Sequence, residues 1–359
     1  MQAALGLARR GLGRVWPNPA VGAVVVRDGM VVGRGWTQPG GRPHAETEAL
    51  GRAGGAAAGA SLYVTLEPCN HVGRTPPCTE AVIAAGIRRT VVAVRDPDPR
   101  VGGGGLARLQ EAGIIVDLGV CEPEAAAVNA GFFLCCTAGR PLITLKTATS
   151  LDGRIAMAGG ESRWITGEAA RAHAHRMRAD HDAVLIGSGT ALADDPDLGC
   201  RLPGMGDRSP VRIVADGRLR LPVTARLVAT ARDIPTHVLT RADADPGKRD
   251  ALKQRGVRVI PVETDADGHL RPGAIAGALG WLGLTRVLIE GGGRLAAAFL
   301  AAGLVDRLAW FRSSGVLGGD GVAAVAALGL PTLAATPRFV RTGIRGLGDD
   351  MLETFERSR

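Results

Sequence analysis

The chain has 359 residues, enough for two domains that each bury a core, and its six cysteines are too few and too scattered for a disulfide-stapled scaffold. The formal net charge is +8, but aromatic residues make up only 3% and no block of lysines and arginines occurs, which argues against a nucleic-acid-binding protein. Arginines interrupt the apolar N-terminal stretch, and no apolar run is long enough to span a membrane. We therefore expect a cytoplasmic protein with free or metal-bound thiols, no membrane partner and an anionic small substrate.

The first 120 residues alternate strand-like and helix-like patterns after a short amphipathic N-terminal helix. Apolar runs at 21–26 and 30–33, joined by R-D-G, predict a hairpin. This alternation predicts an α/β layer fold. Further strands are expected at 62–66, 90–94 and 114–117, helices at 46–53, 79–85 and 106–112, and a glycine loop at 102–105.

A second α/β unit is expected to begin at residue 141, which divides the chain into domains 1–140 and 141–359. Short apolar segments recur there, separated by polar or helical stretches, as in strands that alternate with helices. These segments are I-T-L-K, A-V-L-I, V-R-I-V, H-V-L-T, V-R-V-I and V-L-I-E.

One histidine and two cysteines stand at element ends in the first domain. His44 precedes the expected helix at 46–53, Cys69 follows a strand, and Cys78 precedes another helix. An imidazole and two thiolates suit zinc, and three protein ligands leave the fourth position open for water, which is the catalytic pattern. Glu46 is close enough to take a proton from that water and pass it to a departing amine.

Zinc nucleobase deaminases carry H-x-E followed by P-C-x-x-C. This chain has H-A-E but eight residues between its two cysteines, in E-P-C-N-H-V-G-R-T-P-P-C. Each part alone is also compatible with a surface histidine and ordinary cysteines. Their order, directly after a strand, favours the zinc interpretation.

Several segments resemble the deaminase half of the bifunctional riboflavin-biosynthesis deaminase/reductase family, RibD: P-N-P-A-V-G, G-G-R-P-H-A-E, Y-V-T-L-E-P-C-N-H-V-G-R-T-P-P-C and N-A-G-F-F. The eight-residue insertion is typical of that family. The resemblance implies a cytidine-deaminase-like three-layer α/β/α domain. It also implies one zinc ion on His44, Cys69 and Cys78, with Glu46 as the proton donor.

By the same resemblance, Asn18, His71 and Arg74 contact the deaminase substrate. One position departs from the family pattern. A histidine is common seven residues before the zinc histidine, and here that residue is Thr37. The departure concerns fine specificity rather than zinc chemistry.

In the second domain, V-L-I-E-G-G-G-R-L-A-A-A-F-L reads as a strand, three glycines and a helix. Small residues let backbone N–H groups approach a phosphate, and a helix N-terminus favours negative charge. The dinucleotide fingerprint G-x-G-x-x-G is absent. A plain connecting turn is the alternative for this segment taken alone.

This segment, together with L-I-T-L-K-T-A-T-S-L-D-G-R-I-A, E-S-R-W-I-T-G and R-M-R-A-D-H-D-A-V-L-I-G-S-G-T-A-L-A-D-D-P-D-L, resembles the reductase half of the same family. The resemblance implies a dihydrofolate-reductase-like α/β domain that uses NADPH. Arginines suit such substrates because a guanidinium binds a phosphate ester bidentately. The implied cofactor residues are Ala148, Trp164, Thr190, Asp194, Gly292 and Gly293, and the implied substrate residues are Lys146, Ser162, Arg178, Leu198, Arg201 and Glu290.

A second departure is R-S-S-G-V-L-G at 312–318, where the family often reads A-P-K-L-L-G. It lies near a sheet that is expected to form a homo-oligomer contact or to border the site. Reductase activity or assembly is therefore expected to differ from the family pattern.

The resemblance covers essentially the whole chain and implies two reactions on phosphorylated pyrimidines. The first is hydrolytic deamination of 2,5-diamino-6-(5-phosphoribosylamino)pyrimidin-4(3H)-one. The second is NADPH-dependent reduction of the ribosyl side chain, which gives 5-amino-6-(5-phosphoribitylamino)uracil. The alternatives are a tRNA or nucleobase deaminase with an appended binding domain, a non-enzymatic zinc module, and a protein with only one active domain.

Overall fold

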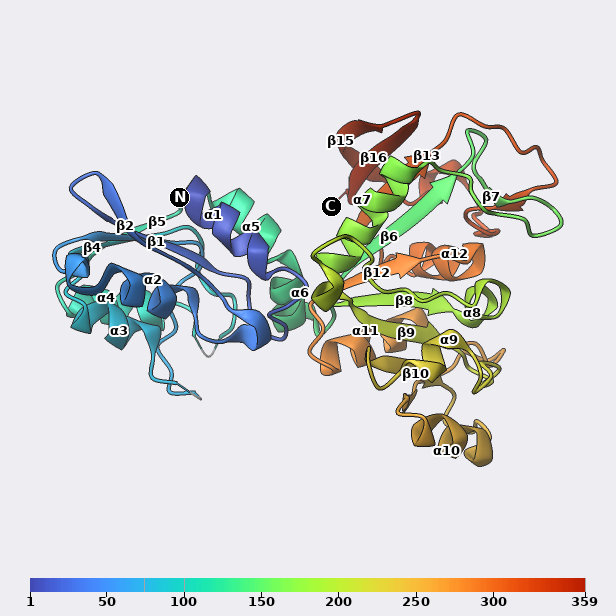
Figure 1. Cartoon of the computed structure of the whole chain (residues 1–359), viewed down its shortest axis with the longest axis horizontal. Coiled ribbons are helices and arrows are strands. Elements are labelled where there is room, and N and C mark those ends of the chain that lie inside the picture. Colours follow the sequence, from blue (N-terminus) through green and yellow to red (C-terminus); the bar gives the residue numbers. More distant parts are fainter. Residues whose placement is uncertain (74, 100, 359) are drawn as a thin grey trace. The chain divides into compact units, whose positions relative to one another are not determined.

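The computed structural model describes residues 1–73, 75–99 and 101–358. The chain forms two compact units, one from Met1 to Gly139 and the other from Arg140 onwards (Figure 1). Within the described ranges, no helix is long and apolar enough to cross a membrane.

The first unit is built on a five-stranded sheet of order β2-β1-β3-β4-β5. The hairpin expected from R-D-G is confirmed, since β1 and β2 pair antiparallel around a turn at Asp28 and Gly29. β1 also pairs antiparallel with β3, whereas β3, β4 and β5 are parallel. The strands are β1 (Gly22–Arg27), β2 (Met30–Trp36), β3 (Ser61–Val64), β4 (Arg89–Val92) and β5 (Ile115–Leu118).

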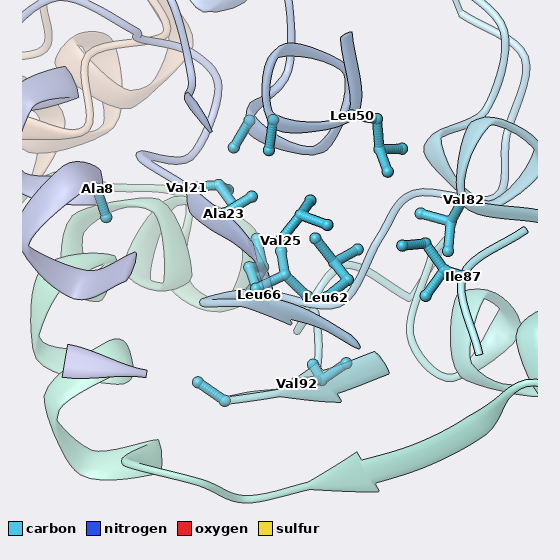
Figure 2. Packing of buried hydrophobic residues seen from close by; sticks show 14 of the residues in the cluster. Ala8, Val21, Ala23, Val25, Leu50, Leu62, Leu66, Val82, Ile87 and Val92 are labelled. Carbon is cyan, nitrogen blue, oxygen red and sulfur yellow. The ribbon is translucent and has the colours of Figure 1, made fainter. Parts of the chain in front are cut away.

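Helices cover both faces of this sheet, which gives the expected three layers. Figure 1 shows α1 and α5 on one face and α2, α3 and α4 on the other. The core under α2 and α3 is made of aliphatic side chains such as Val25, Leu62 and Val82 (Figure 2). The helices are α1 (Gln2–Ala8), α2 (Ala45–Ala53), α3 (Cys78–Ala84), α4 (Gly104–Glu111), α5 (Glu122–Val128) and α6 (Ala130–Ala138), with 3-10 turns at Arg9–Gly11, Pro39–Gly41 and Gly54–Ala57.

The second unit holds a nine-stranded sheet of order β11-β10-β9-β8-β12-β6-β13-β16-β15. The strands from β11 to β13 are parallel, and the β15–β16 hairpin extends the sheet antiparallel. A two-stranded sheet pairs β7 with β14. The strands are β6 (Leu142–Thr149), β7 (Arg154–Ala156), β8 (Ala183–Gly187), β9 (Val211–Ala215), β10 (Thr236–Thr240), β11 (Arg258–Pro261), β12 (Arg286–Glu290), β13 (Arg307–Arg312), β14 (Val322–Ala323), β15 (Phe339–Leu347) and β16 (Asp350–Arg357).

All six strands expected from the apolar segments of this unit are present, as β6 and β8 to β12. The β15–β16 hairpin was not predicted, because β15 is largely exposed and lacks an apolar alternation. The helices are α7 (Glu168–Ala179), α8 (Ser188–Asp194), α9 (Arg226–Ala229), α10 (Pro246–Gln254), α11 (Pro272–Trp281) and α12 (Gly293–Ala301), with 3-10 turns at Gly206–Arg208 and Leu333–Ala335.

Candidate active sites

The three residues proposed as zinc ligands lie together in the first unit. Their ligand atoms are all within 4.8 Å of one another. His44 Nδ1 is 3.2 Å from Cys78 Sγ and 3.7 Å from Cys69 Sγ. His44 is the N-cap of α2, Cys78 is the first residue of α3, and Cys69 lies in the loop after β3. One imidazole nitrogen and two sulfurs at this spacing fit a tetrahedral zinc ion with a position left open.

Glu46 is buried beside this cluster, one residue inside α2, with only 3% of its surface exposed. Burial raises the pKa of Glu46 to about 7. A carboxyl group that titrates near neutrality can both accept and return a proton. Hydrogen bonds from Cys78 lower the pKa of the Cys69 thiol to about 4, which favours the thiolate that binds metal.

Glu67, directly before Pro68 and Cys69, is a positioning residue that was not identified from the sequence. Its buried carboxylate accepts four backbone N–H groups, from Asp96, Gly103, Gly105 and Leu106, at 2.9–3.2 Å. Of the four glycines at 102–105, the first two precede α4 and the last two are its first residues, since α4 begins at Gly104. Glu67 thereby fixes the start of the cysteine loop against the loop that leads into α4.

Asn18 lies in the loop before β1, where two contacts determine its place. A Cβ atom on Gly41 would lie 1.9 Å from Asn18 Nδ2, so only glycine leaves room for this side chain. Asn129, from the N-A-G-F-F segment, accepts from Ala20 N at 2.9 Å and donates to Ala20 O at 3.1 Å. The conspicuous asparagine of N-A-G-F-F therefore holds the loop that carries Asn18.

The other residues of the deaminase hypothesis lie at the surface, outside the described residues, or in the core. His71 is exposed in the loop between the two cysteines. Arg74 lies outside the described residues. Thr37 is buried, and its Oγ1 accepts a hydrogen bond from Val21 N at 2.9 Å. The threonine at this position therefore continues the β1–β2 pairing.

In the second unit, Lys146, Arg178 and Glu290 form a charged cluster in which Glu290 is buried and the two cations are partly buried. Lys146 and Glu290 are direct partners on the adjacent strands β6 and β12, with Nζ 3.8 Å from Oε2. Arg178 of α7 donates to both carboxylate oxygens, at 2.6 and 2.9 Å. Burial alone would raise the pKa of Glu290, but the charges of Arg178 and Lys146 hold it at about 2. Burial also lowers the pKa of Lys146, which makes this ammonium a better acid.

The segment of Leu198 and Arg201 borders this cluster. Arg178 Nη1 donates to Gly199 O at 3.1 Å, so each of its three guanidinium nitrogens donates to a protein group. Arg201 is exposed, and its main-chain N and Nη2 lie 3.3 and 3.4 Å from the ring nitrogens of His175. Of the two arginines proposed for phosphate, Arg201 is the one with a guanidinium open to solvent.

The glycine turn after β12 adjoins Thr190 of α8. Gly291 and Gly292 have φ of 105° and 76°, and a Cβ on Gly292 would lie 3.1 Å from Thr190 Oγ1. Gly293 begins α12, and a Cβ atom on it would meet the main chain of residues 323–326. The first two glycines thus form a backbone cradle at a helix N-terminus, which fits the phosphates of a dinucleotide.

The remaining cofactor and substrate candidates lie around α7 and α8. Trp164 is 67% exposed, with the Arg171 guanidinium 4.6 Å from its ring centroid. Asp194 ends α8, and its main-chain oxygen accepts from the neighbouring Arg163. Ser162 is half-buried before Trp164. Ala148 packs against the cluster that contains Phe311, on β6.

The departing segment at 312–318 is held in place by Asp152, from T-S-L-D-G. Asp152 accepts from Leu317 N at 3.1 Å and from Gly318 N at 2.8 Å. Hydrogen bonds, first from Ser150 and then from these amides, lower the pKa of Asp152 to about 2. The segment is therefore anchored without the proline and lysine of the family pattern.

Two family models match the chain in the order of its two units. Residues 1–94 match the cytidine and deoxycytidylate deaminase zinc-binding region, and residues 141–352 match the RibD C-terminal domain. The riboflavin biosynthesis protein RibD of Aquifex aeolicus is 42% identical over 99% of this chain and 97% of its own length.

Solved structures agree with this similarity. Acinetobacter baumannii RibD has a TM-score of 0.89 at 38% identity, covering 100% of this chain and 98% of its own. The Thermotoga maritima diaminohydroxyphosphoribosylaminopyrimidine deaminase/5-amino-6-(5-phosphoribosylamino)uracil reductase has a TM-score of 0.87 at 34% identity, covering 100% and 97%. Both likenesses extend over the whole chain.

Proposed function

The chain belongs to the RibD family of bifunctional riboflavin-biosynthesis enzymes, and from this premise we propose which of its residues carry out each reaction. The protein is a zinc-dependent deaminase and an NADPH-dependent reductase. Deamination is assigned to residues 1–140, which hold the zinc ligands. Reduction is assigned to residues 141–359, which hold the glycine cradle and the charged cluster.

For deamination, the supporting observation is the buried carboxyl group of Glu46 beside three convergent zinc ligands. Zinc, when bound, acidifies water and so supplies the nucleophile at neutral pH. Glu46 accepts the proton of that water and returns it to the amino group, which leaves the pyrimidine carbon as ammonia. Asn18, His71 and Arg74 are assigned to the binding of the substrate.

For reduction, NADPH supplies a hydride to C1′ of the ribosyl group, and the ring oxygen must gain a proton as the ring opens. Lys146 is a partly buried ammonium whose pKa is lowered by desolvation, which suits proton donation. Glu290 holds Lys146 and Arg178 in place, and the exposed Arg201 binds the substrate phosphate. Ser162 and Leu198 are the remaining residues assigned to the reductase substrate.

The residues assigned to NADPH are those around the cradle. Gly292 is the N-cap of α12 and Gly293 its first residue, Thr190 lies against the turn, and Asp194 closes α8. Trp164 offers an exposed aromatic face. Ala148 of β6, which packs on the Phe311 cluster, is assigned to the cofactor as well.

The deaminase assignment is tested with Glu46→Gln, with Glu48→Gln as the matched control. Glu48 lies on the same helix and pairs with Arg52 at the surface. We expect E46Q to retain zinc, measured by metal analysis, and to lose about 10²-fold or more of its ammonia release, the usual contribution of general acid–base catalysis. E48Q should keep both. Full ammonia release from E46Q would refute the role of Glu46.

We also propose that the reductase unit forms a homo-oligomer. β15 is a sheet edge of nine residues, and its Val340 and Ile344 are 61% and 52% exposed. An exposed edge of this length is a template for pairing with a second chain. Light scattering of the wild type and of Ile344→Asp tests this, with a multimeric wild type and a smaller variant expected. A monomeric wild type would exclude the proposal.

The cytoplasm is the proposed location. None of the six cysteines forms a disulfide, as far as the described residues extend. Reduced thiols that bind zinc are typical of a reducing compartment. Recovery of the enzyme from an oxidising compartment after cell fractionation would contradict this location.

A further inference from the structure

The cysteine loop, residues 69–78, is closed at its base but is held from outside at one point in its middle. At the base, Thr79 N donates to Cys69 O at 3.2 Å, and Cys78 N donates to Cys69 Sγ at 3.4 Å. The exposed positions of the loop are residues 71–73, 75 and 76. Among these described positions, the one hydrogen bond to another part of the chain runs from Arg42 Nη1 to Thr75 Oγ1, at 2.5 Å.

The guanidinium of Arg42 contacts the loop at a second residue as well. A Cβ atom on Gly73 would lie 3.2 Å from Arg42 Nη2, so the guanidinium rests against the main chain of this glycine. A charged donor forms a stronger hydrogen bond than a neutral one does. Arg42 is therefore the attachment that fixes the middle of the cysteine loop.

The segment that carries Arg42 is itself firmly placed. Gln38 N donates to Pro43 O at 3.0 Å, which closes the turn around Arg42. One residue before it, Gly41 packs against the asparagine assigned to the deaminase substrate, and two residues after it, His44 is a proposed zinc ligand. Arg42 thus ties the cysteine loop to the segment from which the zinc site is built.

The exposed loop would sample other positions without this attachment, because it has few contacts of its own. His71, which is assigned to the substrate, lies four residues before Thr75 in this loop. On the proposed deaminase function, we propose that Arg42 is a positioning residue, which holds the cysteine loop through Thr75 and Gly73 so that His71 meets the pyrimidine substrate. Arg42 acts through the loop and not on the reacting atoms.

Three substitutions separate the two partners of this contact. Arg42→Gln removes the charged donor, Thr75→Ala removes the acceptor and leaves the arginine in place, and the third protein carries both changes. Arg42→Lys keeps the charge but loses the planar fork of donors. Arg27→Gln is the control, because it removes the same charge from a side chain at the β1–β2 turn that is 46% exposed.

Two kinds of measurement are made on the full-length, zinc-loaded proteins. The first is the kcat and KM of ammonia release, together with the zinc content. The second needs no activity: it is the rate at which thermolysin cuts the chain before Val72, which is 83% exposed in the cysteine loop. Cleavage of this kind follows the population of the opened loop.

We expect R42Q and T75A each to raise the KM about fivefold or more, with kcat changed less than about twofold, because the lost bond positions the loop and not the reacting groups. Cleavage before Val72 should become about tenfold faster, as for the loss of a hydrogen bond to a charged group. Zinc content should not change. R42K should lie in between, R27Q should match the wild type, and the double variant should be no worse than R42Q, since both changes remove one contact.

Equal cleavage rates and KM values in R42Q and R27Q would overturn the proposal. A T75A that matches the wild type while R42Q loses substrate affinity would show that Arg42 contacts the substrate itself, and loss of zinc from R42Q would place its effect at the metal; either result excludes the positioning role. Failure of the proposed function would look different, because the wild type itself would then release no ammonia.

Discussion

The substitution Glu67→Gln tests how the cysteine loop is held. The carboxylate accepts two amides on each oxygen: Gly105 and Leu106 on Oε1, and Asp96 and Gly103 on Oε2. Glutamine has the same shape, but its NH₂ group donates rather than accepts. Whichever way it is turned, two buried N–H groups face another donor.

The expected cost follows from the two hydrogen bonds that are lost. Each hydrogen bond to a charged group contributes about 1.5–3 kcal/mol, so E67Q should lower the free energy of unfolding of the first unit by about 3–6 kcal/mol. Such a loss is comparable with the whole stability of a small domain, so α4 should open more often even under native conditions.

Hydrogen exchange of the α4 amides in the full-length, zinc-loaded protein measures this change within the first unit. Glu80→Gln is the control, since Glu80 pairs with Arg108 at the surface, where an ion pair contributes about 1 kcal/mol or less. If the α4 amides exchange as slowly in E67Q as in E80Q, the four hydrogen bonds of Glu67 do not anchor this loop.

Three further predictions concern the two sites. Gly41→Ala should displace Asn18 and so raise the KM of the deaminase about fivefold or more. Gly40→Ala is the control, because Gly40 has a similar φ of 78° but open space at its Cβ, so this substitution should only lower the free energy of unfolding by about 1 kcal/mol. Equal KM values for the two variants would contradict the role of Gly41. Asp152→Asn should speed hydrogen exchange of the amides at 317 and 318, and unchanged rates would show that the carboxylate does not hold that segment. Because the pKa of Glu290 is lowered to about 2, its charge stabilises the second unit above the ordinary pKa of 4.5, and this contribution is lost as pH falls toward 2. Glu290→Gln should therefore make the free energy of unfolding depend less on pH in this range than in the wild type. The same pH dependence in both proteins would contradict this prediction.

The convergence of the three proposed zinc ligands was predictable from the sequence because its chemistry is local. His44, Cys69 and Cys78 each stand next to an element that periodicity places, and only a few side-chain types bind zinc. The α/β units were predictable for a similar reason, since apolar runs and turn residues report on local burial.

The supporting residues were not predictable, because their partners are distant in the chain. Asn129 bonds to Ala20 across more than a hundred residues, and Glu67 bonds to amides around position 100 that carry no side-chain signal. Arg178 was expected to bind phosphate, yet in the structure its fork is occupied by Glu290. The role of an arginine depends on its partner, which sequence spacing does not reveal.

The central claim is that one chain performs two reactions at two separate sites. It is tested most directly by giving the diaminopyrimidine substrate and NADPH to the wild type, to E46Q and to E290Q, while ammonia release and NADPH oxidation are followed together. The wild type should show both, E46Q should oxidise NADPH only when given the deaminated intermediate, and E290Q should release ammonia without oxidising NADPH. A folded E46Q that fails to oxidise NADPH even with the deaminated intermediate, or a folded E290Q that releases no ammonia, would contradict the claim.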